Sequence, residues 1–237
     1  MIGYKNEQNR IFNSFRHYDV KQYGQSGTAI SIEGCRPDMW KREVYEVAQC
    51  SGDMVKSKSN GTILTAGAQT DLFCDPVGVA TNTTAPVMLT TIDNTRPFTF
   101  TVKVKPQFTK AGTYSAGAIL AFVDESHWQK LCFEQDEKGN HRIVTVRTVG
   151  TSDDNNHERS ESSSVYLRLS SNTKIIGSYY SEDGINWKLV RVYKNEFPAT
   201  FFLGISSQSP KDKSHSCQFS DVSIVDKAVA NFRKGSL

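Results

Sequence analysis

The stretch 128–134 reads WQKLCFE, and its side chains alternate between an apolar and a polar set. Leu131 and Phe133 form the apolar set, and they alternate with Lys130, Cys132 and Glu134. Successive side chains of a β-strand point to opposite faces of a sheet, so this alternation predicts a strand with one face in a core. The same pattern recurs through residues 98–225, and these residues therefore decide the fold.

Nine segments in this region are predicted as strands, and turn clusters such as Lys138-Gly139-Asn140 separate most of them. The gaps are too short for crossover helices, which disfavours an alternating βαβ architecture. The pattern predicts an all-β antiparallel sandwich or barrel. The nine segments are 98–105, 114–123, 128–135, 142–148, 164–170, 175–181, 187–193, 200–206 and 216–225.

The first part of the chain is harder to interpret. Asn60-Gly61 predicts a turn before the alternating segment 62–65, whereas residues 40–47 fit either a strand or a single helical turn. A short apolar alternation also occurs at 28–32. We expect three parts: an N-terminal extension (1–56) that adds strands or a lid to the same domain, a sandwich (57–225) and a C-terminal tail (226–237).

The bulk composition bounds the class of protein. The 237 residues are 38% hydrophobic and 11% aromatic, which suffices for a core. Because 28 basic residues nearly balance 25 acidic ones and no Lys/Arg run stands out, we expect no nucleic-acid partner. No window approaches about 18 consecutive apolar residues, and no secretory signal is visible. We therefore expect a cytoplasmic protein without a membrane partner.

Metal and disulfide signals are weak. The five cysteines are scattered without a Cys-x-x-Cys pair, and the five histidines show no metal-ligand spacing, so we expect no cofactor. The segment from Ser152 to Glu158 is predicted as a loop rich in hard oxygen ligands, which makes calcium an alternative. It lacks the spacing of a calcium loop, and a solvated Asx turn explains it equally well.

Charged and aromatic residues are predicted to share one face of the sandwich. In the segment 142–148 we assign Val144 and Val146 to the core and Arg147 to the polar face. Such a face either binds a polar, ring-containing ligand or is the ordinary solvated side of a half-buried sheet. The predicted ligand-binding set, with either Trp as the stacking surface, is Trp128, Lys130, Glu134, Arg147, Asp154, Arg168, Trp187 and Gln208.

Catalysis is not indicated by any complete motif. Glu134 and Asp136 resemble part of the Glu-x-Asp-x-Glu motif of retaining sandwich glucanases, but Lys138 stands where the second Glu would be. A glycosidase needs two carboxylates across a cleft, so this departure removes the pair. We assign no catalytic residue, and Glu134 would be the acid/base if the protein were an enzyme.

Five short motifs, in this order, resemble a known family. They are Thr70-Asp71-Leu72-Phe73, Ala116-Gly117-Ala118-Ile119-Leu120, Trp128-x-Lys130-Leu131-x-Phe133-Glu134, Ser181-x-Asp183-Gly184-x-x-Trp187 and Gly204-x-x-x-Gln208-Ser209-Pro210. Together they resemble the concanavalin A-like domain of unknown function whose fungal member is called regulation of enolase protein. The resemblance covers residues 57–225, implies a jelly-roll sandwich of two antiparallel sheets, and implies a relation to lectin and glucanase folds.

Three functional hypotheses follow. The first is a non-catalytic protein that binds carbohydrate, or another small polar ligand, on the polar face. The second is a regulatory module that binds a metabolic enzyme through this face or through a sheet edge. The third is a sugar-active hydrolase or isomerase that uses Glu134.

Overall fold

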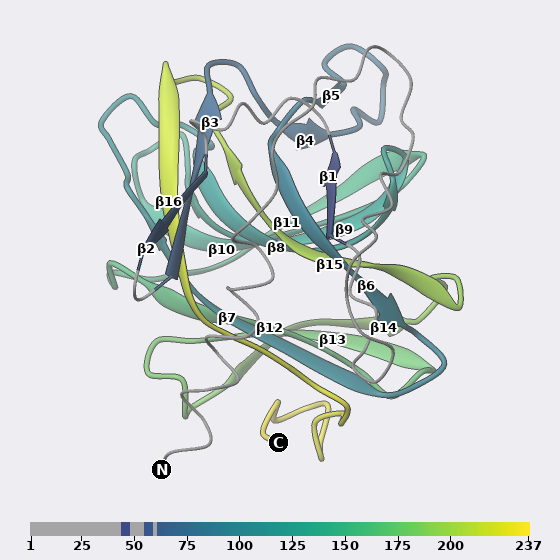
Figure 1. Ribbon diagram of the computed structural model, residues 1–237. Helices are drawn as coiled ribbons and strands as arrows, with labels where there is room; N and C mark the ends of the chain where they lie inside the picture. Colours follow the sequence, from purple (N-terminus) through teal and green to yellow (C-terminus); the bar gives the residue numbers. More distant parts are fainter. Residues whose placement is uncertain (1–43, 48–54, 59–60) are drawn as a thin grey trace.

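Two antiparallel sheets of seven strands lie face to face in the computed structural model, which describes residues 44–47, 55–58 and 61–237 (Figure 1). Sheet A has the order β1 (Val44–Val47), β6 (Val87–Asp93), β15 (Thr200–Gln208), β8 (Ala116–Asp124), β9 (His127–Gln135), β10 (His141–Val149) and β11 (Thr151–Arg159). Sheet B has the order β14 (Lys188–Lys194), β13 (Ile175–Ser181), β12 (Val165–Ser171), β7 (Phe98–Pro106), β16 (Ser214–Val225), β3 (Gly61–Gly67) and β2 (Val55–Lys58). A small third sheet pairs β4 (Leu72–Phe73) with β5 (Asn82–Thr83).

This arrangement confirms the predicted concanavalin A-like jelly-roll sandwich. Each of the nine predicted segments between residues 98 and 225 overlaps an observed strand, and all the pairings within the two sheets are antiparallel. Many neighbours within a sheet are distant in sequence, as where β15 lies between β6 and β8. Among the described residues, no helix has the length and apolarity needed to cross a bilayer.

The N-terminal region contributes an edge strand to each sheet. β1 pairs with β6 at the edge of sheet A, and β2 pairs with β3 at the edge of sheet B. β1 falls in the segment 40–47, for which the sequence left a strand and a helical turn open. The alternation at 28–32 lies outside the described residues.

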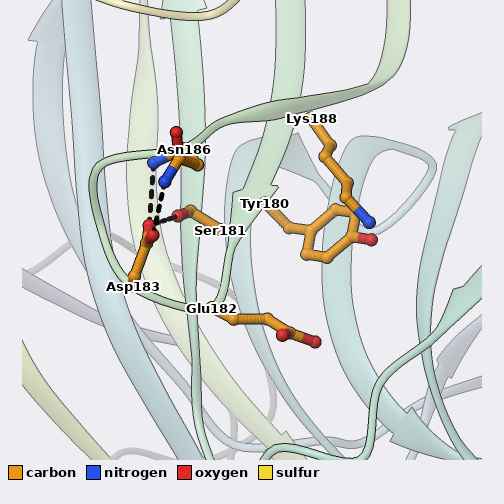
Figure 2. A pocket seen from close by; sticks show the side chains of 6 residues that line it. All are labelled: Tyr180, Ser181, Glu182, Asp183, Asn186 and Lys188. Carbon is orange, nitrogen blue, oxygen red and sulfur yellow. Dashed lines mark hydrogen bonds between the residues drawn. The ribbon is translucent and has the colours of Figure 1, made fainter.

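The turn between β13 and β14 is tight. Gly184 has a φ of 76°, a left-handed conformation that favours glycine. The Asp183 carboxylate accepts hydrogen bonds from the backbone N–H groups of Ile185 and Asn186 and from the Ser181 hydroxyl. Figure 2 shows this turn beside a shallow pocket whose lining also includes Tyr180 and the side chains of Glu182 and Lys188.

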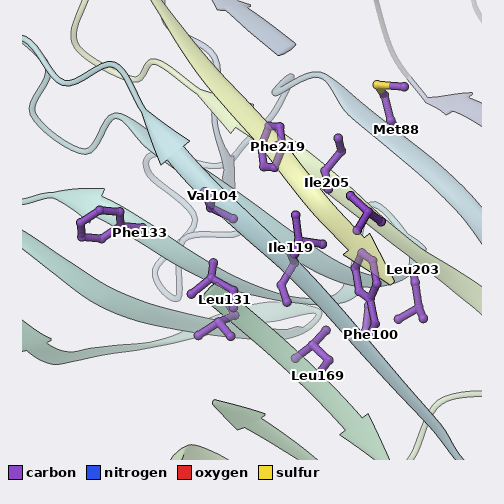
Figure 3. Close-up of a cluster of buried hydrophobic side chains, with 14 of the residues drawn as sticks. Met88, Phe100, Val104, Ile119, Leu131, Phe133, Leu169, Leu203, Ile205 and Phe219 are labelled. Carbon is purple, nitrogen blue, oxygen red and sulfur yellow. The ribbon is translucent and has the colours of Figure 1, made fainter. Parts of the chain in front are cut away.

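The main core fills the space between the sheets. It draws Leu131 and Phe133 from sheet A and Phe100, Val104 and Phe219 from sheet B, all at most 2% exposed (Figure 3). Full burial of a side chain of this size contributes about 1.5–3 kcal/mol relative to exposure, so this layer dominates the stability of the sandwich.

The facing of β10 is the reverse of the prediction. Ile143 lies opposite Phe133 and belongs to the main core, whereas Val144 lies opposite Cys132 on the outer face of sheet A. Both faces of β10 are buried here, so apolar residues occur on both. Alternation alone does not tell two such faces apart.

The C-terminal tail packs on the outer face of sheet B. The Tyr179 hydroxyl donates to the Phe232 carbonyl at 2.9 Å, and Arg168 Nη1 donates to the Gly235 carbonyl at 2.7 Å. Val229 is 4% exposed, and its N–H donates to the Ser170 hydroxyl. Residues 226–237 are therefore docked along the sheet rather than frayed.

Candidate ligand-binding site

The outer face of sheet A, turned away from sheet B, carries a second buried cluster. The segment 70–86, with β4 and β5, packs over this face (Figure 1). It contributes Leu72, Cys74 and Ala85 to an apolar group that includes Leu120 and Val146 of the sheet. The segment thus screens from solvent a face that would otherwise be exposed.

Polar side chains converge beside this apolar group, on β9 and β15. Lys130 Nζ donates to Asp71 Oδ1 at 3.3 Å and to Gln208 Oε1 at 2.8 Å. Gln208 Nε2 donates in turn to Glu134 Oε2 at 3.3 Å and to the Tyr114 carbonyl at 2.8 Å. We call Lys130, Glu134, Gln208 and Asp71 the polar cluster.

The strand register explains this convergence. Gln208 of β15 and Glu134 of β9 both lie opposite Ala116 of β8, so a small residue separates two long polar ones in one row. Lys130 is four residues from Glu134 on the same face of β9, because side chains at even separations share a face. Asp71 is supplied by the covering segment just before β4.

Burial gives the polar cluster its electrostatic character. Lys130 is 3% exposed and Glu134 is 8% exposed. Burial disfavours the carboxylate form and raises the pKa of Glu134 to about 8, although the charge of Lys130 opposes this shift. Burial alone would lower the pKa of Lys130, but the negative charge of Asp71 and of other neighbours outweighs it, and the pKa is raised. Near neutral pH the cluster therefore holds an ammonium group and a carboxyl group that retains its proton.

Exposed residues border the polar cluster. Asp154 of β11 lies opposite Val146, which lies opposite Lys130, and its side chain is exposed. Partial desolvation of its carboxylate is the main cause that raises the pKa of Asp154, and the positive charge of Lys130 opposes this shift. Tyr114 is 39% exposed and has a φ of 63°, an unusual conformation for a large side chain.

Trp128 does not provide the predicted stacking surface. It is on the same face as Lys130, whose Nζ lies 5.8 Å from the indole centroid, but the ring is fully buried. Its Nε1–H donates to the Glu125 carbonyl at 3.1 Å. The indole is a core element beneath the covering segment, and Tyr114 is the exposed aromatic residue beside the cluster.

Arg147, Arg168 and Trp187 lie away from the polar cluster, contrary to the prediction that these residues share one face. Arg147 is on the inner face of sheet A and forms an ion pair with Glu196 at 2.7 Å. Arg168 is on the outer face of sheet B, where its guanidinium lies 3.6 Å from the Trp187 ring centroid. These side chains were grouped because alternation assigns a face within one sheet but does not tell one sheet from the other.

The predicted loop over Ser152–Glu158 is the edge strand β11. Its side chains alternate in direction, so Asp153 forms an ion pair with Arg191 while Asp154 faces the other side of the sheet. The calcium alternative was based on a loop, whereas this segment is a strand. In the part of the chain that the structure describes, no group of three or more His, Cys, Asp or Glu side chains is placed to hold a metal ion.

Asp136 has a structural role in the β9–β10 hairpin. Its carboxylate accepts hydrogen bonds from the Lys138 and Asn140 backbone N–H groups and forms an ion pair with Arg142 at 3.0 Å. Despite burial, which opposes the shift, these donors lower the pKa of Asp136 to about 2. It is therefore a permanent anion that fixes the turn.

Asp71 and Tyr114 are the two residues beside Lys130 and Glu134 that the predicted set omits. Asp71 belongs to a motif that carries the family resemblance, and this was a usable signal. Tyr114 begins the predicted segment 114–123 and shares its parity with Ala116 and Ala118, so the alternation already assigned these three residues to one face. The contact between Asp71 and Lys130 does not follow from sequence, because the covering segment docks through tertiary packing.

The fold and the covered outer face place the chain among concanavalin A-like β-sandwich proteins. Residues 36–227 match the family described as "Protein of unknown function (DUF1349)", and the chain belongs to this family. No curated protein sequence matches it.

Solved structures with the same fold come from several kinds of protein. A functionally unknown protein from Saccharomyces cerevisiae aligns with a TM-score of 0.67 and 19% identity, over 78% of this chain and 96% of that one. The carbohydrate binding module CBM66 from Bacillus subtilis aligns with a TM-score of 0.51 and 10% identity, over 76% and 94%. The GH43 protein BlXynB from Bacillus licheniformis aligns with a TM-score of 0.61 and 14% identity over 77% of this chain, which spans only 36% of that protein. At these identities the likeness shows the fold alone.

Proposed function

We propose that the protein binds a carbohydrate, or another small polar ligand, at the polar cluster on the outer face of sheet A, without catalysis. The observation that carries this proposal is the buried contact chain from Asp71 through Lys130 and Gln208 to Glu134. Buried polar groups of this kind are costly to assemble, and their concentration beside exposed residues is typical of binding sites.

Each group has a role that fits a hydroxylated ligand. Asp71 and the bordering Asp154 supply acceptors, and Lys130 supplies donors. Glu134, with a pKa of about 8, can donate from its protonated carboxyl group. Tyr114 offers a partly exposed ring on which the apolar face of a sugar can stack. The carbohydrate-binding module with the same fold supports this class of ligand by analogy.

Calorimetric titration of the whole chain with neutral mono- and oligosaccharides tests the proposal. We expect saturable binding that Lys130→Met and Asp71→Asn each weaken at least about tenfold, since each removes a charged partner of the cluster. Lys103→Met is the matched control, because Lys103 of β7 lies on the outer face of sheet B and its loss should leave affinity unchanged. Failure of every sugar to bind, or equal weakening by Lys103→Met, would contradict the proposal.

The same site favours one catalytic alternative, because a protonated Glu134 could donate a proton to a leaving group. Incubation with aryl glycosides distinguishes the two functions. Turnover that Glu134→Gln abolishes would replace binding by catalysis, whereas absence of turnover together with saturable binding supports the proposal.

A second candidate function is regulatory contact with a metabolic enzyme, and enolase is the first partner to test because the fungal member of the resembled family is called regulation of enolase protein. The supporting observation is the loop between β4 and β5, where Val77 is 80% exposed and Val79 is 84% exposed. Asp75 holds this loop by accepting hydrogen bonds from the Val77 and Ala80 N–H groups. An interaction measurement with purified enolase tests this role: binding should require Val77 and Val79, and wild-type protein that fails to bind would remove it.

A further inference from the structure

Several polar side chains face the interior between the two sheets, near the edge formed by β10, β11, β13 and β14. Gln129 and Thr145 of sheet A are each fully buried, although both carry groups that form hydrogen bonds. They lie on the inner face of the sheet, opposite to the face that carries Lys130, and are therefore separate from the proposed ligand site.

Contacts link these residues across the two sheets. Gln129 Nε2 donates to the Ser178 hydroxyl of β13 at 2.7 Å, and Ser178 lies opposite Arg191 of β14. Arg147 lies opposite Gln129 in the β9–β10 register, and its guanidinium lies 5.2 Å from the Tyr193 ring centroid. Thr145 is two residues before Arg147 and shares its face. The register and contacts thus place Gln129, Thr145 and Tyr193 along one strip between the sheets.

Three buried atoms of this strip have no hydrogen-bond partner in the described part of the chain: Gln129 Oε1, Thr145 Oγ1 and the Tyr193 hydroxyl oxygen. Native proteins rarely leave such atoms unpaired, because an unmet buried group retains its full desolvation penalty. Burial also raises the pKa of Tyr193. Three unmet atoms along one strip indicate that a bound molecule supplies the missing partners.

We propose that this inter-sheet strip is a binding site for neutral hydroxyl groups, supplied by ordered water or by a small polyol. The amide oxygen of Gln129 can only accept, so the occupant must donate at that position. The hydroxyls of Thr145 and Tyr193 can donate or accept, which a water molecule or an alcohol matches. An anion without protons would leave the Gln129 oxygen facing another acceptor.

Two ion pairs form the outer rim of the strip. Arg147 binds Glu196 at 2.7 Å, and Arg191 binds Asp153 at 3.0 Å. The glutamate and aspartate side chains are 50% and 69% exposed, whereas the two arginines are 29% and 21% exposed. The carboxylates therefore lie on the solvent side of each pair. Because exposed ion pairs break at a small cost in free energy, the rim can open and the strip can exchange its occupant.

A high-resolution crystal structure of the whole chain, determined without polyols and again after an ethylene glycol soak, tests the occupant. We expect ordered density within hydrogen-bond distance of Gln129 Oε1 and of at least one of the two hydroxyls. Glycol density in the soaked crystal would identify the polyol source, and unchanged water density would identify water alone. Absence of ordered density in both crystals would overturn the proposal.

Thermal unfolding of Thr145→Val gives a second test, with Thr148→Val on the same strand as the matched control. The Thr148 hydroxyl is buried and paired with Ser152 at 2.8 Å, so its loss should lower Tm by about 2–4 °C. If Thr145 bonds a bound molecule, Thr145→Val should lower Tm by a comparable amount. A raised or unchanged Tm for Thr145→Val would show that its hydroxyl is unpaired and would overturn the proposal.

Discussion

Glu134 has an environment that differs strongly from that of an exposed glutamate. Its pKa is raised to about 8 from an ordinary value of 4.5 by burial. Between these two values the folded protein holds a proton that the unfolded chain has released, so the contribution of Glu134 to stability is fully present below pH 4.5 and is lost as pH rises through 8. The size of this effect is on the order of 3–5 kcal/mol.

Glu134→Gln should therefore remove a pH dependence rather than a fixed amount of stability. The amide cannot ionise, and its oxygen can still accept from Gln208. We expect the variant to gain stability relative to wild type as pH rises from 5 to 8.5, as measured by urea unfolding at several pH values. Parallel curves for the two proteins would show that Glu134 is not held protonated by the fold.

His215 changes stability with pH in the opposite direction to Glu134. Burial lowers its pKa to about 4, and its Nδ1 lies 3.0 Å from the Ser207 hydroxyl. Below pH 6.5 the unfolded chain binds a proton that the folded chain refuses until pH reaches about 4, so stability falls over this interval. His215→Gln should reduce the loss of unfolding free energy between pH 6.5 and 4, as measured by urea unfolding. An unchanged pH dependence over this interval would show that His215 is not held neutral by the fold.

At the scale of elements, the docked tail requires the absence of a side chain at Gly235 in addition to its hydrogen bonds. Gly235 has a φ of 73°, and a Cβ there would lie 2.5 Å from Cδ1 of the Tyr179 ring. Gly235→Ala should therefore undock residues 226–237 and lower Tm by about 5–10 °C, a loss of a few kcal/mol. The control is Gly139→Ala, where the φ is also positive but no atom lies within 4 Å of the added Cβ.

Equal Tm losses in the two alanine variants would mean that backbone strain alone explains the effect. A larger loss for Gly235→Ala, together with proteolytic release of the tail, would confirm the packing role.

The elements themselves were largely predictable from sequence, with one informative failure. Every strand with a clear apolar alternation was found, because burial of one face imposes a period of two. β11 was taken for a loop because Asp153, Asp154, Asn155 and Asn156 have low strand propensity. It forms a strand because its backbone pairs with β10. Polar side chains suit this position, because they discourage an exposed sheet edge from pairing with other chains.

At the scale of the whole molecule, the sequence predicted the architecture and three of the four residues of the polar cluster. Lys130, Glu134 and Gln208 share a face because their strands are neighbours on either side of β8. Arg147 and Arg168 were misplaced because the choice between inner and outer faces, and between sheets, depends on the docking of distant segments. Asp71 reaches Lys130 only because the segment 70–86 folds over sheet A.

Stability at this scale should reside in the inter-sheet core and not in the ion pairs that link the sheet edges. Asp153→Asn and Glu158→Gln each break an exposed pair and should change the free energy of unfolding by about 0–1 kcal/mol. Leu131→Ala, at a fully buried position, should cost about 2–5 kcal/mol. Chemical denaturation of the three variants checks this ranking, and a larger loss from either ion-pair variant would reverse it.

The docking of the tail fixes where anything appended to this chain would emerge. Leu237 is 49% exposed beside the outer face of sheet B, on the far side of the sandwich from Lys130 and Gln208. An affinity tag or a surface tether fused there would orient the molecule with its polar cluster toward the solution. Immobilised sensors and glycan arrays can thus use this end without obstructing the proposed site.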